Sequence, residues 1–140
     1  MDNDVKQIAG ELKETKEIDK ALFCNFDVFK DIYRYETRQL ERRGYSLVLM
    51  LLEIFCVKEK ALAEELPPYA KEALNECCMQ TLRKGDVFAN YSETQTLVML
   101  IVANVMDAAK VTNRLCERFN TGEFGGRVHL KAETQSSLQM

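Results

Sequence analysis

The strongest constraint on the fold of this chain is a pair of apolar runs joined by a short polar connection. Val87, Phe88 and Tyr91 form the first run, and residues 96–102 form a longer one rich in aliphatic side chains. The residues between them, 92–95, are small or polar, as in a hairpin connection. The segment therefore predicts two antiparallel strands with a tight polar turn.

Helices and strands alternate along the rest of the chain. A stripe of apolar side chains predicts a helix over 27–43, which Asp27 helps to cap and Gly44 stops. Elsewhere the periodicity predicts a buried strand over 45–55, helices over 68–84 and 105–119, and a strand at Val128, Leu130 and Ala132. The order helix-β-α-β-β-α-β favours an α+β domain with a ferredoxin-like antiparallel sheet and packed helices.

Composition narrows the class of protein. With 140 residues, of which 46% are hydrophobic and 29% are charged, the chain has room for one compact domain with its own core. A net charge of −3 gives no broad electropositive surface, so we expect no direct contact with nucleic acid. There is no signal peptide or long uninterrupted apolar span, so we expect a cytoplasmic location and no contact with a membrane.

The cysteines and the lone histidine do not form a recognisable reactive set. None of the five cysteines belongs to a Cys-x-x-Cys pair, and the single histidine, His129, is distant in sequence. We interpret the cysteines as reduced core residues and expect neither a metal site nor a cofactor. No Ser-His-Asp set, Cys-His set or phosphate-binding glycine loop is recognisable, so the sequence predicts no enzyme and no catalytic residues.

The N-terminal 20 residues differ from the rest of the chain. They are rich in charge, and Val5, Ile8 and Leu12 keep a weak heptad-like spacing. Two interpretations remain open: a polar linker, or a lead helix continuing from an upstream domain. The predicted organisation is therefore this lead over 1–20, a domain over 21–134 and a tail over 135–140.

The hairpin segment resembles the GGDEF domain, the diguanylate cyclase module of bacteria. Arg83 and Asp86 fit the Arg-x-x-Asp element that precedes its signature turn. The five signature positions then read Ser92-Glu93-Thr94-Gln95-Thr96, and none of the five is kept. In that family the two glycines leave room for the nucleotide and the acidic pair holds Mg²⁺. Because this chain has neither, the resemblance implies a degenerate, catalytically inactive nucleotide cyclase fold.

Two further segments align with catalytic segments of that family but lack their characteristic residues. Residues 46–54 are similar to its first strand, and in the best register Leu51 and Glu53 take the positions of its two Asp residues. Residues 58–68 align with the segment that contacts the base and phosphates of the nucleotide in that family, and they contain no recognisable phosphate-binding loop. The resemblance therefore implies that no metal is bound.

A narrower resemblance covers residues 21–34 and 82–92. Both segments are similar to the degenerate GGDEF-like domain at the C-terminus of bacterial transcriptional activator (BTAD)-type regulators. That resemblance implies a regulatory or interaction domain of a larger cytoplasmic transcriptional regulator. Its partners would be upstream domains of the same protein or a second copy in a homodimer.

The Arg83-x-x-Asp86 element leaves two interpretations open. An arginine fork and a carboxylate suit the phosphates and guanine edges of cyclic di-GMP, so both residues are candidate nucleotide-binding residues. Alternatively, they form a local ion pair or cap where a helix passes into a strand. An inactive regulatory domain thus has two alternatives. The first is a sensor that binds cyclic di-GMP or another nucleotide, and the second is a homodimerisation module.

Overall fold

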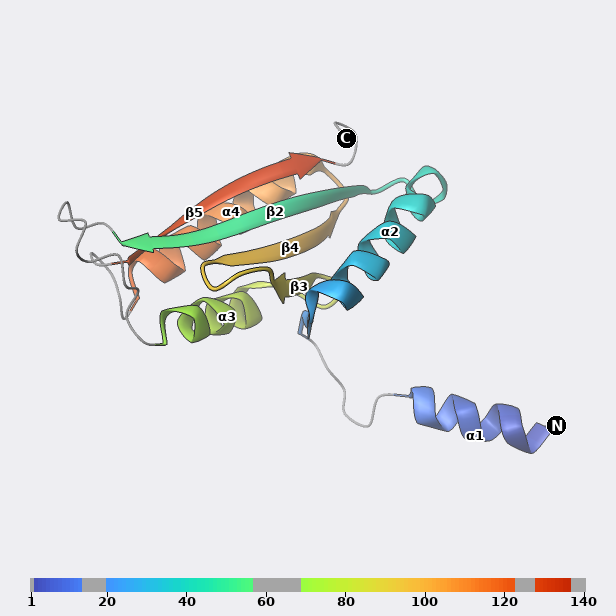
Figure 1. Ribbon diagram of the computed structural model, residues 1–140. Coiled ribbons are helices and arrows are strands. Elements are labelled where there is room, and N and C mark those ends of the chain that lie inside the picture. Colours follow the sequence, from blue (N-terminus) through green and yellow to red (C-terminus); the bar gives the residue numbers. More distant parts are fainter. Residues whose placement is uncertain (1, 14–19, 57–68, 123–127, 137–140) are drawn as a thin grey trace.

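The computed structural model describes residues 2–13, 20–56, 69–122 and 128–136. Four helices and five strands alternate in this part of the chain (Figure 1). In order, they are α1 (Asp2–Leu12), β1 (Leu22–Cys24), α2 (Phe26–Arg43), β2 (Ser46–Cys56), α3 (Ala70–Thr81), β3 (Val87–Asn90), β4 (Gln95–Val102), α4 (Val105–Asn120) and β5 (Val128–Ser136).

The strands form one sheet in the order β1-β3-β4-β2-β5. Each neighbouring pair among β3, β4, β2 and β5 is antiparallel, which is the predicted ferredoxin-like arrangement. The predicted hairpin is confirmed as β3 and β4. The sequence prediction missed β1, which pairs in parallel with β3 at the edge of the sheet. Three residues are too few to show a recognisable period of two.

Helices cover both faces of the sheet and divide the core into two parts. On one face, α3 and α4 pack against a large cluster that includes Met50, Leu52 and Leu115, each with no exposed surface. On the other face, α2 covers a smaller cluster around Phe29 and Met99 (Figure 1). Both faces of the central strands are therefore buried, which explains why their sequences are almost continuously apolar.

The ends of α2 and α3 agree with the sequence prediction at some residues and differ from it at others. Gly44 ends α2 in the left-handed conformation, with φ of 62°, as predicted. The N-cap is Asn25 and not Asp27, since Asn25 Oδ1 accepts a hydrogen bond of 2.9 Å from the Val28 N–H. The helix predicted over 68–84 ends earlier, at Thr81, because the following residues turn towards β3. Residues 58–68 and the glycines at 125 and 126 lie outside the described residues.

The N-terminal lead is helical over Asp2–Leu12 and lies away from the sheet (Figure 1). Its three apolar side chains are exposed, with 68% of Val5, 53% of Ile8 and 78% of Leu12 accessible. No helix in the described part of the chain is both long and apolar enough to span a bilayer.

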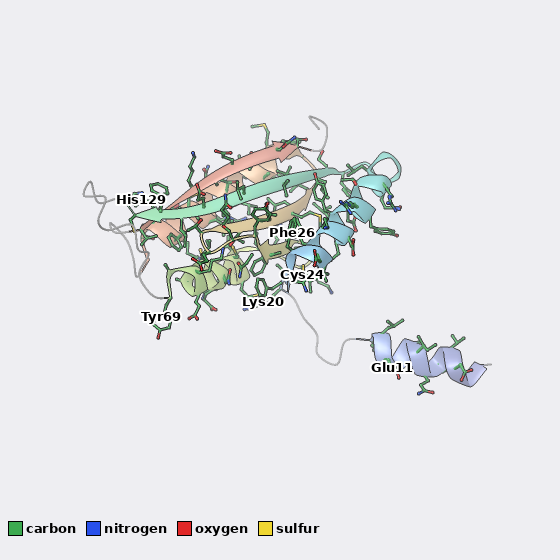
Figure 2. All side chains as sticks on the ribbon, viewed as in Figure 1. Glu11, Lys20, Cys24, Phe26, Tyr69 and His129 are labelled. Atoms are coloured by element: carbon green, nitrogen blue, oxygen red, sulfur yellow. The ribbon has the colours of Figure 1, made fainter. Side chains whose placement is uncertain are left out.

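The five cysteines are spread over strands and helices, and three of them, Cys24, Cys56 and Cys116, are only half-buried, so the prediction that all are core residues was wrong for these three. Figure 2 labels Cys24 and His129. Cys24 is on β1 and His129 is on β5, at opposite edges. Cys77 and Cys78 are buried in α3, and burial raises the pKa of both thiols, that of Cys78 to about 12. These two thiols are core residues, as the sequence predicted.

Candidate functional site

The signature positions form a turn that is closed by its own side chains. Ser92 N–H donates to the Gln95 carbonyl at 3.2 Å, and Gln95 N–H donates to the Ser92 carbonyl at 3.4 Å. The Ser92 hydroxyl also donates to Gln95 Oε1 at 3.0 Å. The Ser92 side chain therefore bonds within the turn, at a position where the family signature has a glycine.

Lys71, on the first turn of α3, reaches the same turn from the side. Its ammonium donates to the Gln95 carbonyl and to Thr96 Oγ1, both at 2.6 Å, and Thr96 Oγ1 donates in turn to Asn90 Oδ1 at 3.2 Å. Burial lowers the pKa of Lys71 to about 8, against a smaller raising effect of the Cys78 thiol. A cation thus occupies the end of the hairpin where the resemblance places acidic residues and a metal.

The sheet register places Glu53 of β2 opposite Gln95 and Leu51 opposite Leu97. Ile54 N–H donates to the Thr94 carbonyl at 2.9 Å, so β2 follows the hairpin to its turn. Of the two positions aligned with the family's Asp pair, one is therefore a carboxylate beside the turn and the other is aliphatic. Within the described ranges, no group of three or more His, Cys, Asp or Glu side chains is arranged to hold a metal ion.

The lowered pKa of Lys71 predicts a pH dependence of stability. Between pH 8 and the ordinary pKa of 10.5, the unfolded chain carries the Lys71 proton more often than the folded chain does. The contribution of this residue to the free energy of unfolding therefore increases as pH rises through this window. Urea denaturation from about pH 7 to about pH 10 should show the wild type gaining stability relative to Lys71→Met. A difference that is constant with pH would contradict the prediction, since the buried thiols are common to both proteins.

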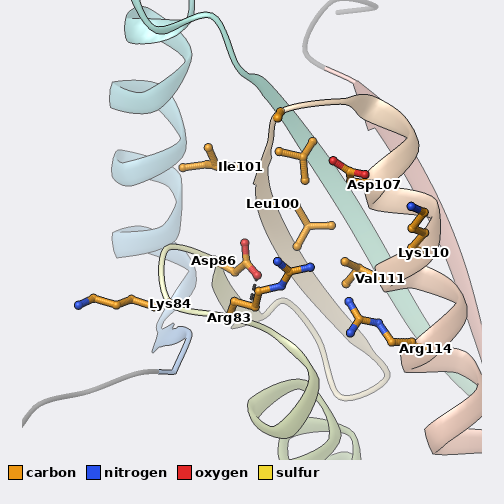
Figure 3. A pocket seen from close by; sticks show the side chains of 11 residues that line it. Arg83, Lys84, Asp86, Leu100, Ile101, Asp107, Lys110, Val111 and Arg114 are labelled. Atoms are coloured by element: carbon orange, nitrogen blue, oxygen red, sulfur yellow. Dashed lines mark hydrogen bonds between the residues drawn. The ribbon is translucent and has the colours of Figure 1, made fainter.

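A second feature is a basic pocket of about 730 Å³, beyond the C-terminal end of α3. Three segments line it: the turn before β3, the end of β4 and one side of α4 (Figure 3). Arg83 and Arg114 point towards each other across it, whereas Lys84 extends away (Figure 3). The charged side chains that line the pocket are Arg83, Lys84, Lys110, Arg114, Asp86 and Asp107. Four cations and two carboxylates leave an excess of two positive charges.

Asp86 is part of the turn itself. Only 9% of it is exposed, and its Oδ2 accepts a hydrogen bond of 2.9 Å from the Arg83 N–H. Burial raises the pKa of the Asp86 carboxyl, while the backbone N–H groups of Arg83 and Ile101 and the Arg83 guanidinium lower it. Its carbonyl accepts from the Leu22 N–H at 2.9 Å, so Asp86 also anchors β1. Both predicted site residues thus line one pocket, with Asp86 holding the backbone and Arg83 exposed.

Lys110 and Arg114 were not predicted as site residues. They lie on α4, whose buried stripe consists of Ala108, Val111, Leu115 and Phe119. A spacing of four residues puts both cations on one side of the helix. This spacing was present in the sequence, but only the packing of α4 beside the Arg83 turn shows that it faces a pocket.

Known proteins match this chain by structure and not by sequence. No family model and no curated protein matches the sequence. The structure of the diguanylate cyclase SiaD from Pseudomonas aeruginosa, in complex with its activator SiaC, aligns with a TM-score of 0.67 at 16% identity. The alignment covers 96% of this chain and 55% of that one. This chain has a GGDEF-like fold.

Two further structures support the GGDEF-like fold. The coiled coil and GGDEF domain of DgcB from Caulobacter crescentus, solved with c-di-GMP, aligns with a TM-score of 0.63 at 10% identity, covering 96% of this chain and 74% of that one. A sensory box/GGDEF family protein from the same organism gives 0.54 at 14% identity, covering 80% and 77%. The fold predicted from the hairpin is therefore confirmed, and these low identities speak to the fold alone.

Proposed function

We propose that this chain is a GGDEF-like regulatory or interaction domain that does not catalyse cyclic di-GMP synthesis. The observation that carries the proposal is the Lys71 ammonium at 2.6 Å from the Gln95 carbonyl and Thr96 hydroxyl. Below its pKa of about 8, the Lys71 ammonium repels a divalent cation at this position, and Thr94 and Gln95 replace the acidic pair with neutral side chains. Phosphoryl transfer then has neither its metal nor the ligands that hold it.

Incubation of the purified chain with GTP tests this proposal. We expect no cyclic di-GMP above background with either Mg²⁺ or Mn²⁺, under conditions in which an active diguanylate cyclase converts the substrate. Separation of the nucleotides by chromatography measures the product. Formation of cyclic di-GMP that disappears in Glu53→Gln would overturn the proposal, because it would show a working metal site beside the turn.

The proposal extends to the setting of the domain. The similarity of residues 21–34 and 82–92 to BTAD-type regulators supports a place within a larger cytoplasmic transcriptional regulator of a bacterium. In such a protein, this domain would contact the upstream domains and leave DNA binding to them. The sequence of the full open reading frame tests the idea, since a membrane or sensor domain upstream in place of a DNA-binding region would contradict it.

Binding of cyclic di-GMP is a second candidate function, and the basic pocket favours it. Cyclic di-GMP carries two phosphodiester charges, and the side chains that line the pocket carry an excess of positive charge. Arg83 and Arg114, which face each other, offer two guanidinium forks for phosphate oxygens or guanine edges. The DgcB structure, solved with c-di-GMP, is a GGDEF domain with this ligand.

A homodimer is the remaining candidate, and α1 favours it. An 11-residue helix with Val5, Ile8 and Leu12 exposed is marginal alone, so a second copy that covers this stripe would stabilise it. We expect light scattering to show a mass that rises with concentration for the full chain and stays monomeric without residues 1–20. A monomer at every concentration in both proteins would remove this candidate.

A further inference from the structure

The sheet has two edges of very different length. One edge is β1, with three residues, and the other is β5, with nine (Figure 1). In the strand order β1-β3-β4-β2-β5, β5 pairs with β2 on one side only. A long edge strand presents a row of backbone N–H and C=O groups with which another strand can pair. The outer side of β5 is therefore the edge best suited to pairing with a second chain.

Two hydrogen bonds show which residues of β5 point outwards. Ile54 N–H donates to the Thr94 carbonyl on the β4 side of β2, so the odd-numbered residues of β2 direct their backbone groups towards β5. Their partners in the ladder are the odd-numbered residues of β5. In agreement, Leu130 N–H donates at 3.0 Å to Asn120 Oδ1, which belongs to α4 and not to the sheet. The even-numbered residues of β5, with Ala132 at their centre, therefore direct their backbone groups outwards.

Two copies of β5 can pair antiparallel about a two-fold axis through Ala132, which is the central residue of the strand. In this register all nine residues of one strand lie opposite all nine of the other. The two Ala132 residues then exchange two hydrogen bonds, and Thr134 N–H of each copy donates to the Leu130 carbonyl of the other. The Leu130 N–H exchanges the Asn120 oxygen for a carbonyl and gains no bond. The pairing thus adds four backbone hydrogen bonds.

The charges of β5 select the same register. Lys131 and Glu133 are exposed over 60% and 66% of their side chains and form an ion pair of 3.4 Å along the strand. With the axis at Ala132, Lys131 of each copy lies opposite Glu133 of the other, at a non-hydrogen-bonded position where cross-strand side chains are closest. A shift of two residues in either direction places lysine opposite lysine or glutamate opposite glutamate, which is destabilising. Full overlap and charge complementarity therefore favour one and the same pairing.

We propose that β5 pairs with β5 of a second copy of this chain, which joins the two sheets into one. This inference rests on the homodimer candidate above and makes its interface more specific. Four hydrogen bonds and exposed ion pairs hold two chains weakly, so contact between the α1 helices is needed to raise the effective concentration of the edges. The residues that line the basic pocket lie outside β5, so the pairing leaves that pocket open.

The α1 helices can meet while the β5 edges are paired. The two β1 strands would lie about 43 Å apart, at nine spacings of about 4.8 Å. Residues 13–21 join α1 to β1, and a segment of this length spans up to about 30 Å. Two such segments together exceed the distance between the β1 strands, so both contacts can form in one dimer.

Sedimentation equilibrium of the full chain tests the proposal through the Kd of the dimer. Lys131→Glu and Glu133→Lys each place like charges opposite one another in both cross-strand pairs, so we expect each to raise the Kd at least about 10-fold. An equimolar mixture of these two variants again opposes unlike charges, as does the double variant that combines them. Both should return the Kd to within about 3-fold of the wild type. Lys30→Glu, on α2, changes the net charge as Lys131→Glu does and should leave the Kd within about 2-fold.

The outcomes separate the pairing from the homodimer on which it rests. A dimer whose Kd is the same in the wild type and in both single variants would show that α1 alone joins the copies, and would overturn the β5 pairing only. Single variants that neither the mixture nor the double variant restores would overturn it as well. A wild type that stays monomeric at every concentration would remove the homodimer and the pairing together. Dimerisation of the double variant would show that neither substitution prevents folding.

Discussion

We expect Arg114→Gln to weaken the proposed binding of cyclic di-GMP about 10- to 100-fold, because each charge-assisted hydrogen bond to a phosphate contributes about 1.5–3 kcal/mol. Arg114 faces Arg83 across the basic pocket and belongs to α4, a different element from the predicted Arg83-x-x-Asp86 turn. Glutamine keeps the aliphatic stem and a hydrogen-bond donor, and it removes the charge and the guanidinium fork. Titration calorimetry at fixed ionic strength measures the loss.

Lys131→Gln is the matched control for this substitution. Lys131 is a cation on β5, with 60% of its side chain exposed and Glu133 as its ion-pair partner. Its replacement changes the net charge of the protein equally but leaves the pocket untouched, so affinity should stay within about 2-fold. Equal losses in both variants would show that the ligand responds to overall charge only. An unchanged affinity in Arg114→Gln would remove α4 from the binding site.

Leu115→Ala will lower the free energy of unfolding by about 2–5 kcal/mol. Leu115 has no exposed surface and joins α4 to the cluster that α3 and the sheet share. Removing most of its side chain leaves a cavity where the packing has little room to collapse. Because about 1 kcal/mol corresponds to about 4–8 °C in a small domain, the melting temperature should fall by about 10 °C or more.

Met106→Ala serves as the control on the same helix. Met106 is 72% exposed in the first turn of α4, so its truncation should change the free energy of unfolding by less than about 0.5 kcal/mol. Similar losses in the two variants would mean that the buried stripe of α4 is not where the helix docks. Denaturant unfolding of both proteins, with unchanged m-values, makes the comparison.

The fold was predictable because its signals are local and repeated. The polar turn between two apolar runs predicted β3 and β4, and Gly44 predicted the end of α2 from its tolerance of positive φ. Strand β1 carries no such signal. Its place depends on pairing with residues more than sixty positions away along the chain, and tertiary contacts alone determine it.

The candidate site was predictable only where its residues are neighbours in sequence. Arg83 and Asp86 belong to one turn, so a short motif was enough to single them out. Arg114 became part of the site through the packing of α4. The sequence pattern did not predict the contact of Lys71 with the hairpin, because a lysine on a helix is usually a solvated charge. Only its hydrogen bonds in the structure identify this contact.

Asp86 connects the lining of the basic pocket to β1, the strand at the edge of the sheet. Its carboxylate holds the Arg83 backbone, while its carbonyl holds the first residue of β1, through which the N-terminal helix joins the domain. A displacement of this turn would therefore reach β1 through two hydrogen bonds that a single residue makes. A ligand that moves the Arg83 turn would thus move the edge strand β1 as well.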